Sequence, residues 1–178
     1  MGCKCGSQVI LCNLPVRFDT YKGCSHGCKY CFAQKKQNIA KIQRDESVEA
    51  LRSFIEGKRG RETAWCDWNI PIHWGGMSDP FQPIEKNIRA SYECLKLLAE
   101  TRYPFVVSTK GRLVVDPEYL DLLEKSNCVV QNSMVTSKYH PLEPGTPPYE
   151  ERLKMVDTLA HRVQRVIVRV QPYMPEVF

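Results

Sequence analysis

Short apolar segments alternate with longer helical stripes along this chain. The residues at 17–21 alternate polar with aromatic side chains, and four further segments are rich in apolar residues, at 70–74, 105–108, 128–135 and 166–170. Short apolar runs that end in glycine or polar residues are typical of strands buried in a parallel sheet. The pattern therefore predicts five strands, with the first leading into a cysteine-containing loop.

Between these segments, apolar residues recur at helical spacing. Four helices are predicted. The first is capped by Asp45 or Ser47, has Val48, Leu51 and Ile55 on one face, and ends at Gly57; the second has Ile84, Ile88, Leu95 and Leu98 and ends near Thr101. The third begins at Asp116-Pro117, and the fourth has Leu153, Val156, Ala160 and Val163 on one face. A strand–helix order repeated in this way predicts an α/β fold, either a doubly wound sheet or a barrel.

In both architectures, ligands bind at the carboxyl ends of the strands. Polar and glycine residues follow the predicted strands at these ends: the cysteine loop 24–31, the segments 75–79 and 108–110, Ser133 and Gln171. The polar residues at several strand ends therefore predict a single ligand site.

Composition describes an ordinary globular protein. The 178 residues are 43% hydrophobic and 25% charged, which suits one domain with a substantial core. No membrane span or secretion signal is recognisable, and nine cysteines argue for reduced thiols rather than disulfides. We therefore expect a cytoplasmic protein with no membrane partner. Residues 1–17 are expected to be irregular, and Cys3, Cys5 and Cys12 to be reduced thiols there.

Positive charge is concentrated in one part of the chain. The net charge is +5, and residues 22–61 hold ten Lys or Arg against four acidic residues. A basic rim beside an active site would attract an anionic substrate, including nucleic acid. More often, such a charged segment forms the solvent-exposed face of a helix.

The most informative motif is a cysteine triad. Cys24, Cys28 and Cys31 follow a C-x3-C-x2-C spacing, with a glycine ahead of each of the first two. Three thiolates at this spacing can hold three irons of a [4Fe–4S] cluster and leave the fourth iron open. Two alternatives are a zinc site with His26 as fourth ligand, and thiols that only pack. A second Cys/His pair, usual in zinc sites, is missing, because Cys66 and His73 stand alone.

The triad and its surroundings resemble the radical S-adenosylmethionine (SAM) superfamily, in the branch related to spore photoproduct lyase. The resemblance rests on the segments 21–33, 78–85, 108–110 and 142–152. It implies a partial TIM-like barrel over residues 18–178, with about five parallel strands present and a sixth βα unit absent. It also implies a [4Fe–4S] cluster, SAM, and an electron donor of the flavodoxin or ferredoxin type.

The resemblance assigns roles to individual residues. It implies that Cys24, Cys28 and Cys31 bind the cluster; that Tyr30 and Phe32 lie against the adenine of SAM; that Gly75, Gly76, Met77, Ser78 and Asp79 meet its amino group; that Ser108, Lys110 and Ser133 reach its ribose and carboxylate; and that Arg152 helps to neutralise that carboxylate. Surface charge and strand-end turns are the ordinary explanations for the same basic and hydroxyl residues.

The implied reaction is reductive cleavage of SAM to a 5′-deoxyadenosyl radical that acts on an unknown substrate. Spore photoproduct lyase uses a cysteine as hydrogen donor where this chain has Met77, which argues against thymine-dimer repair. Because the sequence ends after the fifth strand, a second chain completing the barrel and an inactive fragment are alternatives. A third alternative is a zinc-binding module that contacts nucleic acid through residues 22–61.

Overall fold

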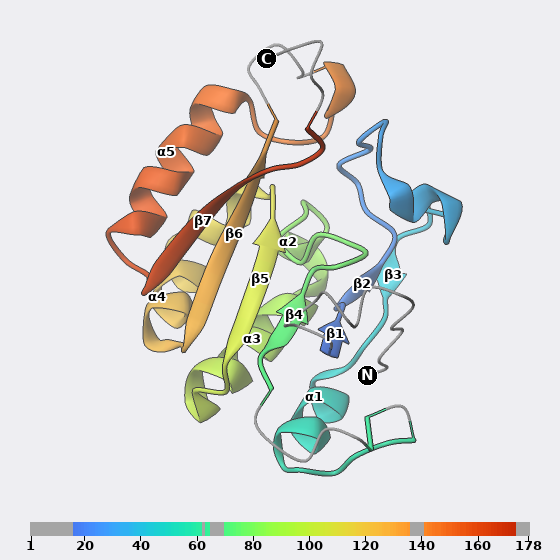
Figure 1. Ribbon diagram of the computed structural model, residues 1–178, viewed down its shortest axis with the longest axis vertical. Coiled ribbons are helices and arrows are strands. Elements are labelled where there is room, and N and C mark those ends of the chain that lie inside the picture. Colours follow the sequence, from blue (N-terminus) through green and yellow to red (C-terminus); the bar gives the residue numbers. More distant parts are fainter. Residues whose placement is uncertain (1–15, 62, 65–69, 136–140, 174–178) are drawn as a thin grey trace.

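The main sheet is parallel and open. A computed structural model describes residues 16–61, 63–64, 70–135 and 141–173 (Figure 1). The strands lie in the order β1 (Val16–Phe18), β4 (Ile72–Trp74), β5 (Phe105–Thr109), β6 (Cys128–Met134) and β7 (Arg165–Val170), and all neighbours are parallel. The predicted α/β fold with five parallel strands is confirmed. In the described residues the sheet is not closed into a barrel.

Helices and a small second sheet surround the main sheet. The helices are α1 (Val48–Ile55), α2 (Glu85–Ile88), α3 (Ala90–Thr101), α4 (Pro117–Lys125) and α5 (Tyr149–Ala160), with short 3-10 turns η2 (Phe32–Lys35) and η3 (Arg112–Val115). Strands β2 (Tyr21–Lys22) and β3 (Gln43–Arg44) pair antiparallel. In Figure 1, α3 and α4 cover the far face of the sheet and α5 lies beside β6 and β7.

The core lies between the sheet and the helices, with Trp74 near its centre. Its ring centroid lies 6.0 Å from that of Phe18, 5.8 Å from Phe81 and 5.9 Å from Phe105. All four rings are almost wholly buried. Full burial stabilises each such side chain by roughly 2–3 kcal/mol. Because apolar residues fill the helix side, polar residues are left for the opposite face of the sheet.

The first predicted strand is interrupted. A single strand was expected over 17–21, but β1 ends at Phe18 and β2 begins at Tyr21. Between them, Asp19 Oδ1 accepts hydrogen bonds from the backbone of Met77 (2.9 Å) and Ser78 (3.2 Å). The chain leaves the sheet at Asp19 because this side chain binds the loop after β4. Val16 and Arg17, expected in the irregular segment, belong to β1.

The long second helix is also interrupted. Arg89 takes a left-handed conformation (φ 59°) between α2 and α3. The buried carboxylate of Glu85 accepts hydrogen bonds from the backbone N–H groups of Ser91 (3.0 Å) and Tyr92 (2.8 Å). These N–H groups belong to the first turn of α3 and have no partner within the helix. Glu85 therefore caps α3 from the preceding helix, which requires the break.

Two helix details differ from the sequence interpretation. The last helix buries Arg152, Met155 and Leu159, whereas Leu153 is 41% exposed; of the predicted apolar stripe, only Val163, which follows the helix, is buried. At α4, Pro117 occupies the first turn as predicted, but the Asp116 side chain makes no capping hydrogen bond. At α1, the Ser47 side chain accepts from the Ala50 N–H, which confirms Ser47 as the cap.

No helix in the described part of the chain is long and apolar enough to cross a membrane. The expectations for Cys3, Cys5, Cys12 and Cys66 lie outside the residues that the structure describes.

Candidate functional site

A cavity of about 530 Å³ lies at the carboxyl ends of the strands. Every residue that the resemblance assigned to cluster or SAM lines it, except Arg152. The wall also contains residues to which the resemblance gave no role: Arg17, His26, Ala33, Lys36, His73, Thr109, Arg169, Gln171 and Pro172. The predicted segments are thus brought together at one place, and parallel strands are the reason.

The three cysteines of the triad line this cavity as free thiols. Cys28 is buried, and Cys24 and Cys31 are partly exposed. Their loop is anchored where the Cys24 N–H donates to Ile39 O (2.8 Å), beside Gly23 with φ +84°. Burial raises the pKa of Cys24 to about 12 and of Cys28 to about 11. Binding to metal must therefore release protons from these thiols.

The thiols do not converge on one point. Among the described residues, no three His, Cys, Asp or Glu side chains are grouped closely enough to hold a single metal ion. All three cysteines line the same cavity. A [4Fe–4S] cluster binds each cysteine at a different iron, so its ligands are spread more widely than those of one ion. Three thiols that line one cavity are the donor type that a cluster of this kind uses.

His26 uses both ring nitrogens within the protein. Nδ1 lies 2.8 Å from Gly145 O, and Nε2 lies 3.0 Å from Asp79 Oδ2. Both partners are acceptors, so both nitrogens must carry hydrogen and the ring is the imidazolium. Burial alone would lower the pKa of His26, but Asp79 and Gly145 O raise it above its ordinary value. The interpretation of His26 as a fourth zinc ligand is wrong, since neither nitrogen is free.

The carboxylate of Asp79 is fully engaged by protein donors. Oδ1 accepts from Phe81 N (2.8 Å) and Thr109 Oγ1 (2.7 Å). Oδ2 accepts from His26 Nε2 (3.0 Å) and Lys110 N (2.6 Å). Burial alone would raise its pKa, but His26 and the other donors hold it below the ordinary range. Asp79 lines the cavity as predicted, but its carboxylate joins three segments of the site and has no free oxygen for an ammonium group.

Glu143 organises a second buried network. Its carboxylate forms ion pairs with Lys110 Nζ (2.9 Å) and Arg152, and accepts a hydrogen bond from Tyr30. Burial alone would raise the pKa of Glu143, but the two cations and Tyr30 lower it. Arg152 also donates to Ser133 O (3.0 Å) and is 1% exposed. Arg152 does not line the cavity and its charge is paired with Glu143, so its help in neutralising the SAM carboxylate stays a prediction.

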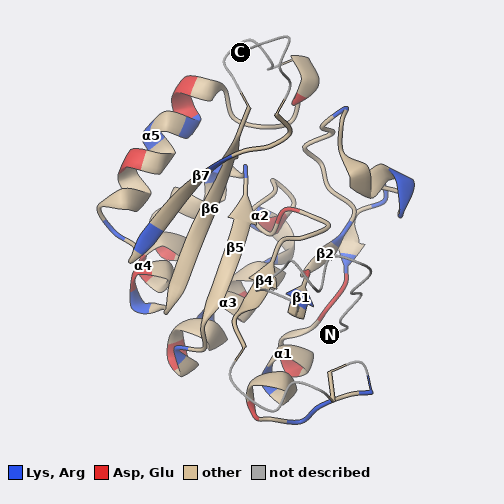
Figure 2. Ribbon diagram, viewed as in Figure 1, with Lys and Arg blue, Asp and Glu red and all other residues tan. Residues whose placement is uncertain are grey.

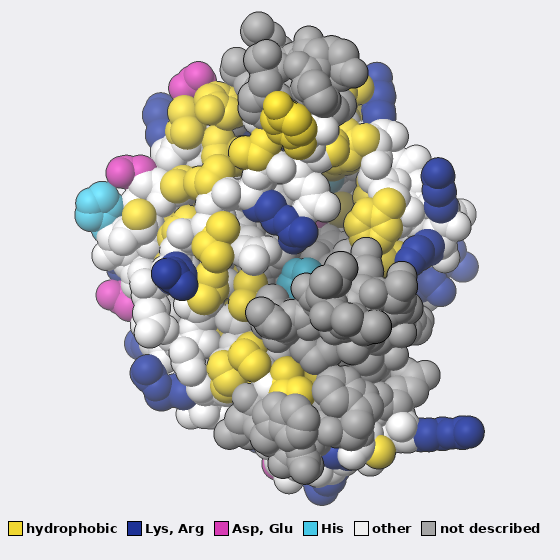
Figure 3. All heavy atoms as spheres, in the orientation of Figure 1, with side chains coloured by type: hydrophobic (Ala, Val, Ile, Leu, Met, Phe, Trp, Pro, Cys, Tyr) yellow, Lys and Arg dark blue, Asp and Glu magenta, His cyan; other side chains and the backbone are white. Residues whose placement is uncertain are grey.

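Polar side chains occupy the sheet face that the helices leave uncovered. Ser108 Oγ donates to Gln131 Oε1 (3.0 Å) and lies 3.0 Å from His73 Nε2, while Arg169 reaches the same Gln131 oxygen at 3.5 Å. Burial, Arg169 and Arg17 lower the pKa of His73, which favours the neutral ring. Figure 3 shows basic and histidine side chains near the centre of this face. The floor of the cavity is thus polar and positively charged.

The loop after β4 closes the cavity wall. Gly75 has φ +85°, and a Cβ there would lie 2.5 Å from Ser108 O, so only glycine suits this position. Asp19 fixes the following backbone through Met77 and Ser78. Ser78 Oγ is buried and has no hydrogen-bond partner among the described residues. A buried hydroxyl without a partner is unfavourable, so this oxygen at the cavity wall is available to hydrogen-bond a ligand.

Two structural residues escaped the sequence interpretation. Asp19 and Glu143 each organise part of the wall, yet neither was assigned a role. Their partners lie far along the chain: Asp19 binds the 77–78 backbone, and Glu143 binds Tyr30. An acidic residue directly after a strand was a usable signal for Asp19, since strand ends form the site. Glu143 gave no local signal beyond lying in the segment 142–152.

No protein-family model matches the chain. An uncharacterized protein of Mycobacterium tuberculosis is 24% identical over 177 residues, which cover 92% of this chain and 52% of that protein. An uncharacterized protein of Methanocaldococcus jannaschii is 24% identical over 170 residues, covering 88% and 60% respectively. The chain therefore spans about half the length of the curated relatives that it matches.

Solved structures of spore photoproduct lyase are similar in fold. A double mutant with bound AdoMet and dinucleoside spore photoproduct superposes with a TM-score of 0.69 at 18% identity, covering 89% of this chain and 46% of that one. A complex with dinucleoside spore photoproduct has a TM-score of 0.65 at 18% identity, covering 88% and 45%. The similarity shows the fold, which agrees with part of a radical SAM barrel.

Proposed function

We propose that this chain is a radical SAM enzyme, or the amino-terminal portion of one, that binds a [4Fe–4S] cluster and SAM in the cavity described above. One observation carries the proposal: three free cysteines line the same cavity as the strand-end hydroxyls and the unpartnered Ser78 Oγ. Thiolate is the ligand that such a cluster requires. A volume of about 530 Å³ lies within the usual range for small-molecule sites.

In this proposal Cys24, Cys28 and Cys31 bind the cluster. Tyr30 and Phe32 lie on the same wall and offer aromatic surface to an adenine ring. A reduced cluster bound here would supply the electron that cleaves SAM into methionine and a 5′-deoxyadenosyl radical. The protein residues bind, orient and shield these groups from water.

The polar contacts to SAM come from the strand ends. Ser78 Oγ and the 75–78 backbone suit the amino group, and the hydroxyls of Ser108 and Ser133 suit ribose. Lys110 suits the carboxylate, although Glu143 already neutralises part of its charge. Asp79 and Arg152 act as positioning residues, since their charges are balanced within the protein.

The substrate is best described as anionic. The solved lyases hold a dinucleoside photoproduct, and a nucleic-acid-like substrate would suit the basic surface beside this cavity. Met77 lines the wall where the resemblance places a hydrogen-donating cysteine, so the proposal does not extend to thymine-dimer repair.

A further structural unit would complete the site. The edge strand β7 exposes Ile167, Val168 and Val170 by 38%, 48% and 45%. Exposed apolar edges invite pairing with another strand. We propose that a sixth βα unit, from a longer chain or from a partner chain, pairs here. An electron donor of the flavodoxin or ferredoxin type and a reducing, cytoplasmic location follow from the cluster chemistry.

Anaerobic reconstitution with iron and sulfide tests the proposal. The protein is expected to turn brown, to give after chemical reduction a [4Fe–4S] EPR signal that changes on addition of SAM, and to release 5′-deoxyadenosine when SAM and excess reductant are present. Cys28→Ala should abolish the cluster, whereas Cys94→Ala, at a buried core cysteine away from the cavity, should retain it. A colourless protein with stoichiometric zinc would overturn the proposal.

A cluster that forms but whose EPR signal does not change with SAM would limit the proposal to the metal site. It would favour the alternative that this chain is an inactive fragment of an enzyme. The zinc-module alternative receives no support from the site, because His26 is already bound through both nitrogens.

A further inference from the structure

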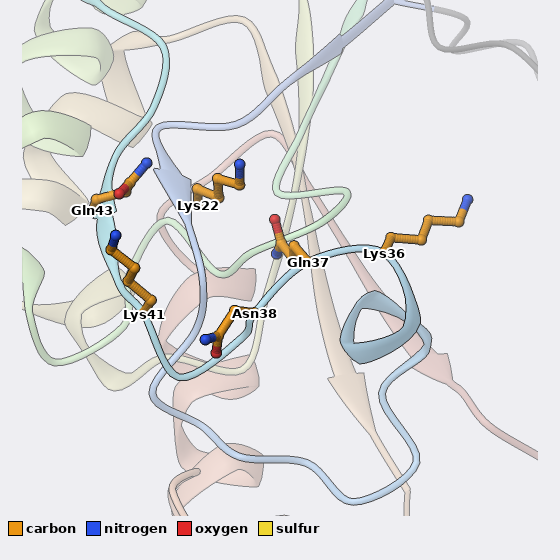
Figure 4. A pocket seen from close by; sticks show the side chains of 6 residues that line it. All are labelled: Lys22, Lys36, Gln37, Asn38, Lys41 and Gln43. Carbon is orange, nitrogen blue, oxygen red and sulfur yellow. The ribbon is translucent and has the colours of Figure 1, made fainter.

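A second, smaller cavity lies on the outer side of the cysteine loop. It has a volume of about 230 Å³ and is formed where β2 and β3 meet the segment after η2. Its lining residues are Lys22, Lys36, Gln37, Asn38, Lys41 and Gln43 (Figure 4). Every lining side chain carries an ammonium or a carboxamide group, and none carries a negative charge. The cavity is therefore rich in hydrogen-bond donors.

The segment from β2 to β3 has no acidic residue, and Asp45 and Glu46 follow it directly. Residues 21–44 contain no Asp or Glu, and they hold Lys22, Lys29, Lys35, Lys36, Lys41 and Arg44. Figure 2 shows these basic positions around β2, β3 and η2. Arg44 is paired with Glu93 (2.6 Å), but neither Lys22 nor Lys41 has an ion-pair partner among the described residues. Within the described residues, the charges of Lys22 and Lys41 are thus not neutralised by an ion pair.

The individual side chains suit a bound oxyanion. Asn38 Oδ1 accepts from Ala40 N (3.2 Å), which leaves the amide nitrogen available as a donor. In Figure 4, Lys41 extends toward Gln43, Lys22 extends to the other side of its strand, and Lys36 points away from both. Ammonium groups bind phosphate oxygens as strongly hydrated point charges. We propose that this cavity is a phosphate-binding site, with Lys22 and Lys41 as its principal cations.

The cavity is mechanically joined to the proposed catalytic site. Lys36 lines both cavities, and Gln37 Nε2 donates to Met77 O (3.2 Å) in the wall of the larger one. The Cys24 N–H donates to Ile39 O (2.8 Å), within the segment that forms the smaller cavity. A phosphate held here would anchor a larger molecule whose neighbouring group reaches the main cavity. This last step rests on the proposed function; the phosphate site itself does not.

The phosphate could belong to a free phosphorylated molecule or to a nucleic-acid backbone, and two experimental arms separate these sources. The first titrates the full chain with inorganic phosphate and follows binding by calorimetry. The second follows a fluorescently labelled single-stranded oligonucleotide by anisotropy at several salt concentrations. Both use protein without a cluster, so their outcome is independent of the radical SAM proposal.

Three variants test the assignment. Lys22→Gln and Lys41→Gln each remove one cation at an exposed position, and Lys154→Gln makes the same change on α5 as the control. Each site variant is expected to reduce the slope of log K against log salt for the oligonucleotide by about 0.7, the contribution of one phosphate contact to a single strand. The control is expected to keep the wild-type slope and phosphate affinity.

Two positive results are distinguishable. Oligonucleotide binding that inorganic phosphate displaces, and that both site variants weaken, assigns the site to a nucleic-acid backbone. Phosphate binding lost in the variants, without oligonucleotide binding, assigns it to a small phosphorylated ligand. The inference is overturned if the site variants bind both probes as the wild type does, or if Lys154→Gln weakens binding equally.

It is also overturned if the variants bind both probes normally and differ from the wild type only in slower reduction of the reconstituted cluster by an acidic flavodoxin. That result would make the lysines a protein-docking surface. Phosphate binding in a protein that assembles no cluster would leave this inference standing and refute the proposed function alone.

Discussion

His26 and Asp79 form a buried ion pair, with 3.0 Å between Nε2 and Oδ2, that joins the cysteine loop to the loop after β4. The two side chains are 3% and 8% exposed. Because each also bonds to a third segment, through Gly145 O and Thr109 Oγ1, the pair connects four parts of the chain at one place.

Replacing Asp79 should therefore be costly. Asp79→Asn leaves the charge of His26 without its counter-charge, and breaking a buried pair in this way costs about 3–5 kcal/mol. The free energy of unfolding from urea titration measures the effect. Asp121→Asn is the control, since Asp121 is 59% exposed and pairs with Arg162 at the surface. Equal stability of Asp79→Asn and the wild type would contradict the central role of this pair.

Glu143 should be needed both for stability and for the shape of the cavity. Glu143→Ala leaves Lys110 and Arg152 without their common carboxylate, which we expect to destabilise the protein by about 3–5 kcal/mol. Glu151→Ala is the matched control, because Glu151 makes a single ion pair with Arg112, which is 68% exposed. Thermal unfolding compares the two. A smaller loss in Glu143→Ala than in the control would show that Glu143 is not the organising residue.

Glycine at position 75 is expected to be essential for packing as well as conformation. Gly57 and Gly75 have nearly the same φ, +84° and +85°, but a Cβ on Gly57 meets nothing within 4 Å, whereas one on Gly75 lies 2.5 Å from Ser108 O. Gly57→Ala should cost about 1 kcal/mol from backbone conformation alone. Gly75→Ala should cost about 3 kcal/mol or more, because the backbone must also shift.

Urea unfolding of both variants provides the comparison. Equal losses of unfolding free energy would mean that the backbone shifts to accept a Cβ at position 75 beside β5 at no further cost.

Asp19 should give stability a distinctive pH dependence. Burial raises the pKa of Asp19 from 3.8 to about 6, although Met77, Arg17 and Ser78 oppose the shift. Between these values the unfolded chain has lost the proton and the folded chain keeps it, so stability falls as pH rises, and it levels off above about pH 6. The shift corresponds to about 3 kcal/mol.

The measurement is the difference in unfolding free energy between the wild type and Asp19→Asn, from about pH 4 to pH 7. The variant has no titrating group at this position, so the difference isolates Asp19. A difference that grows in favour of the wild type with rising pH would contradict the raised pKa.

Much of the fold could be predicted from periodicity alone. Strands such as 105–109 and 128–134 are short and apolar, and their polar ends identified the cavity wall before any coordinates. The failures have a common cause in buried acidic side chains whose partners the hydrophobic pattern does not show. Glu85 caps α3 and forces the break at Arg89, which no local helix pattern indicates. Arg152 is buried because Glu143 neutralises it, so the charge that suggested a surface role was misleading.

The same reason limits prediction of the site. Membership of the cavity follows from the positions of strand ends, so nearly all of the proposed residues line it. Their roles depend on which partners they meet. Asp79 looks like a free carboxylate in the sequence, but it is saturated by donors from residues 26, 81, 109 and 110. Such saturation is visible only in three dimensions.

The contact between the cysteine loop and residues 142–145 has a consequence for the order of biosynthesis. Lys29 N donates to Leu142 O (2.9 Å), and Gly145 N donates to His26 O (2.9 Å). A ribosome adds about 5–20 residues per second, so the cysteines emerge several seconds before the segment that fixes their loop. The nascent loop therefore remains without this support during translation. Under the proposed function, a cluster is therefore expected to be inserted only after the chain has been synthesised past residue 145.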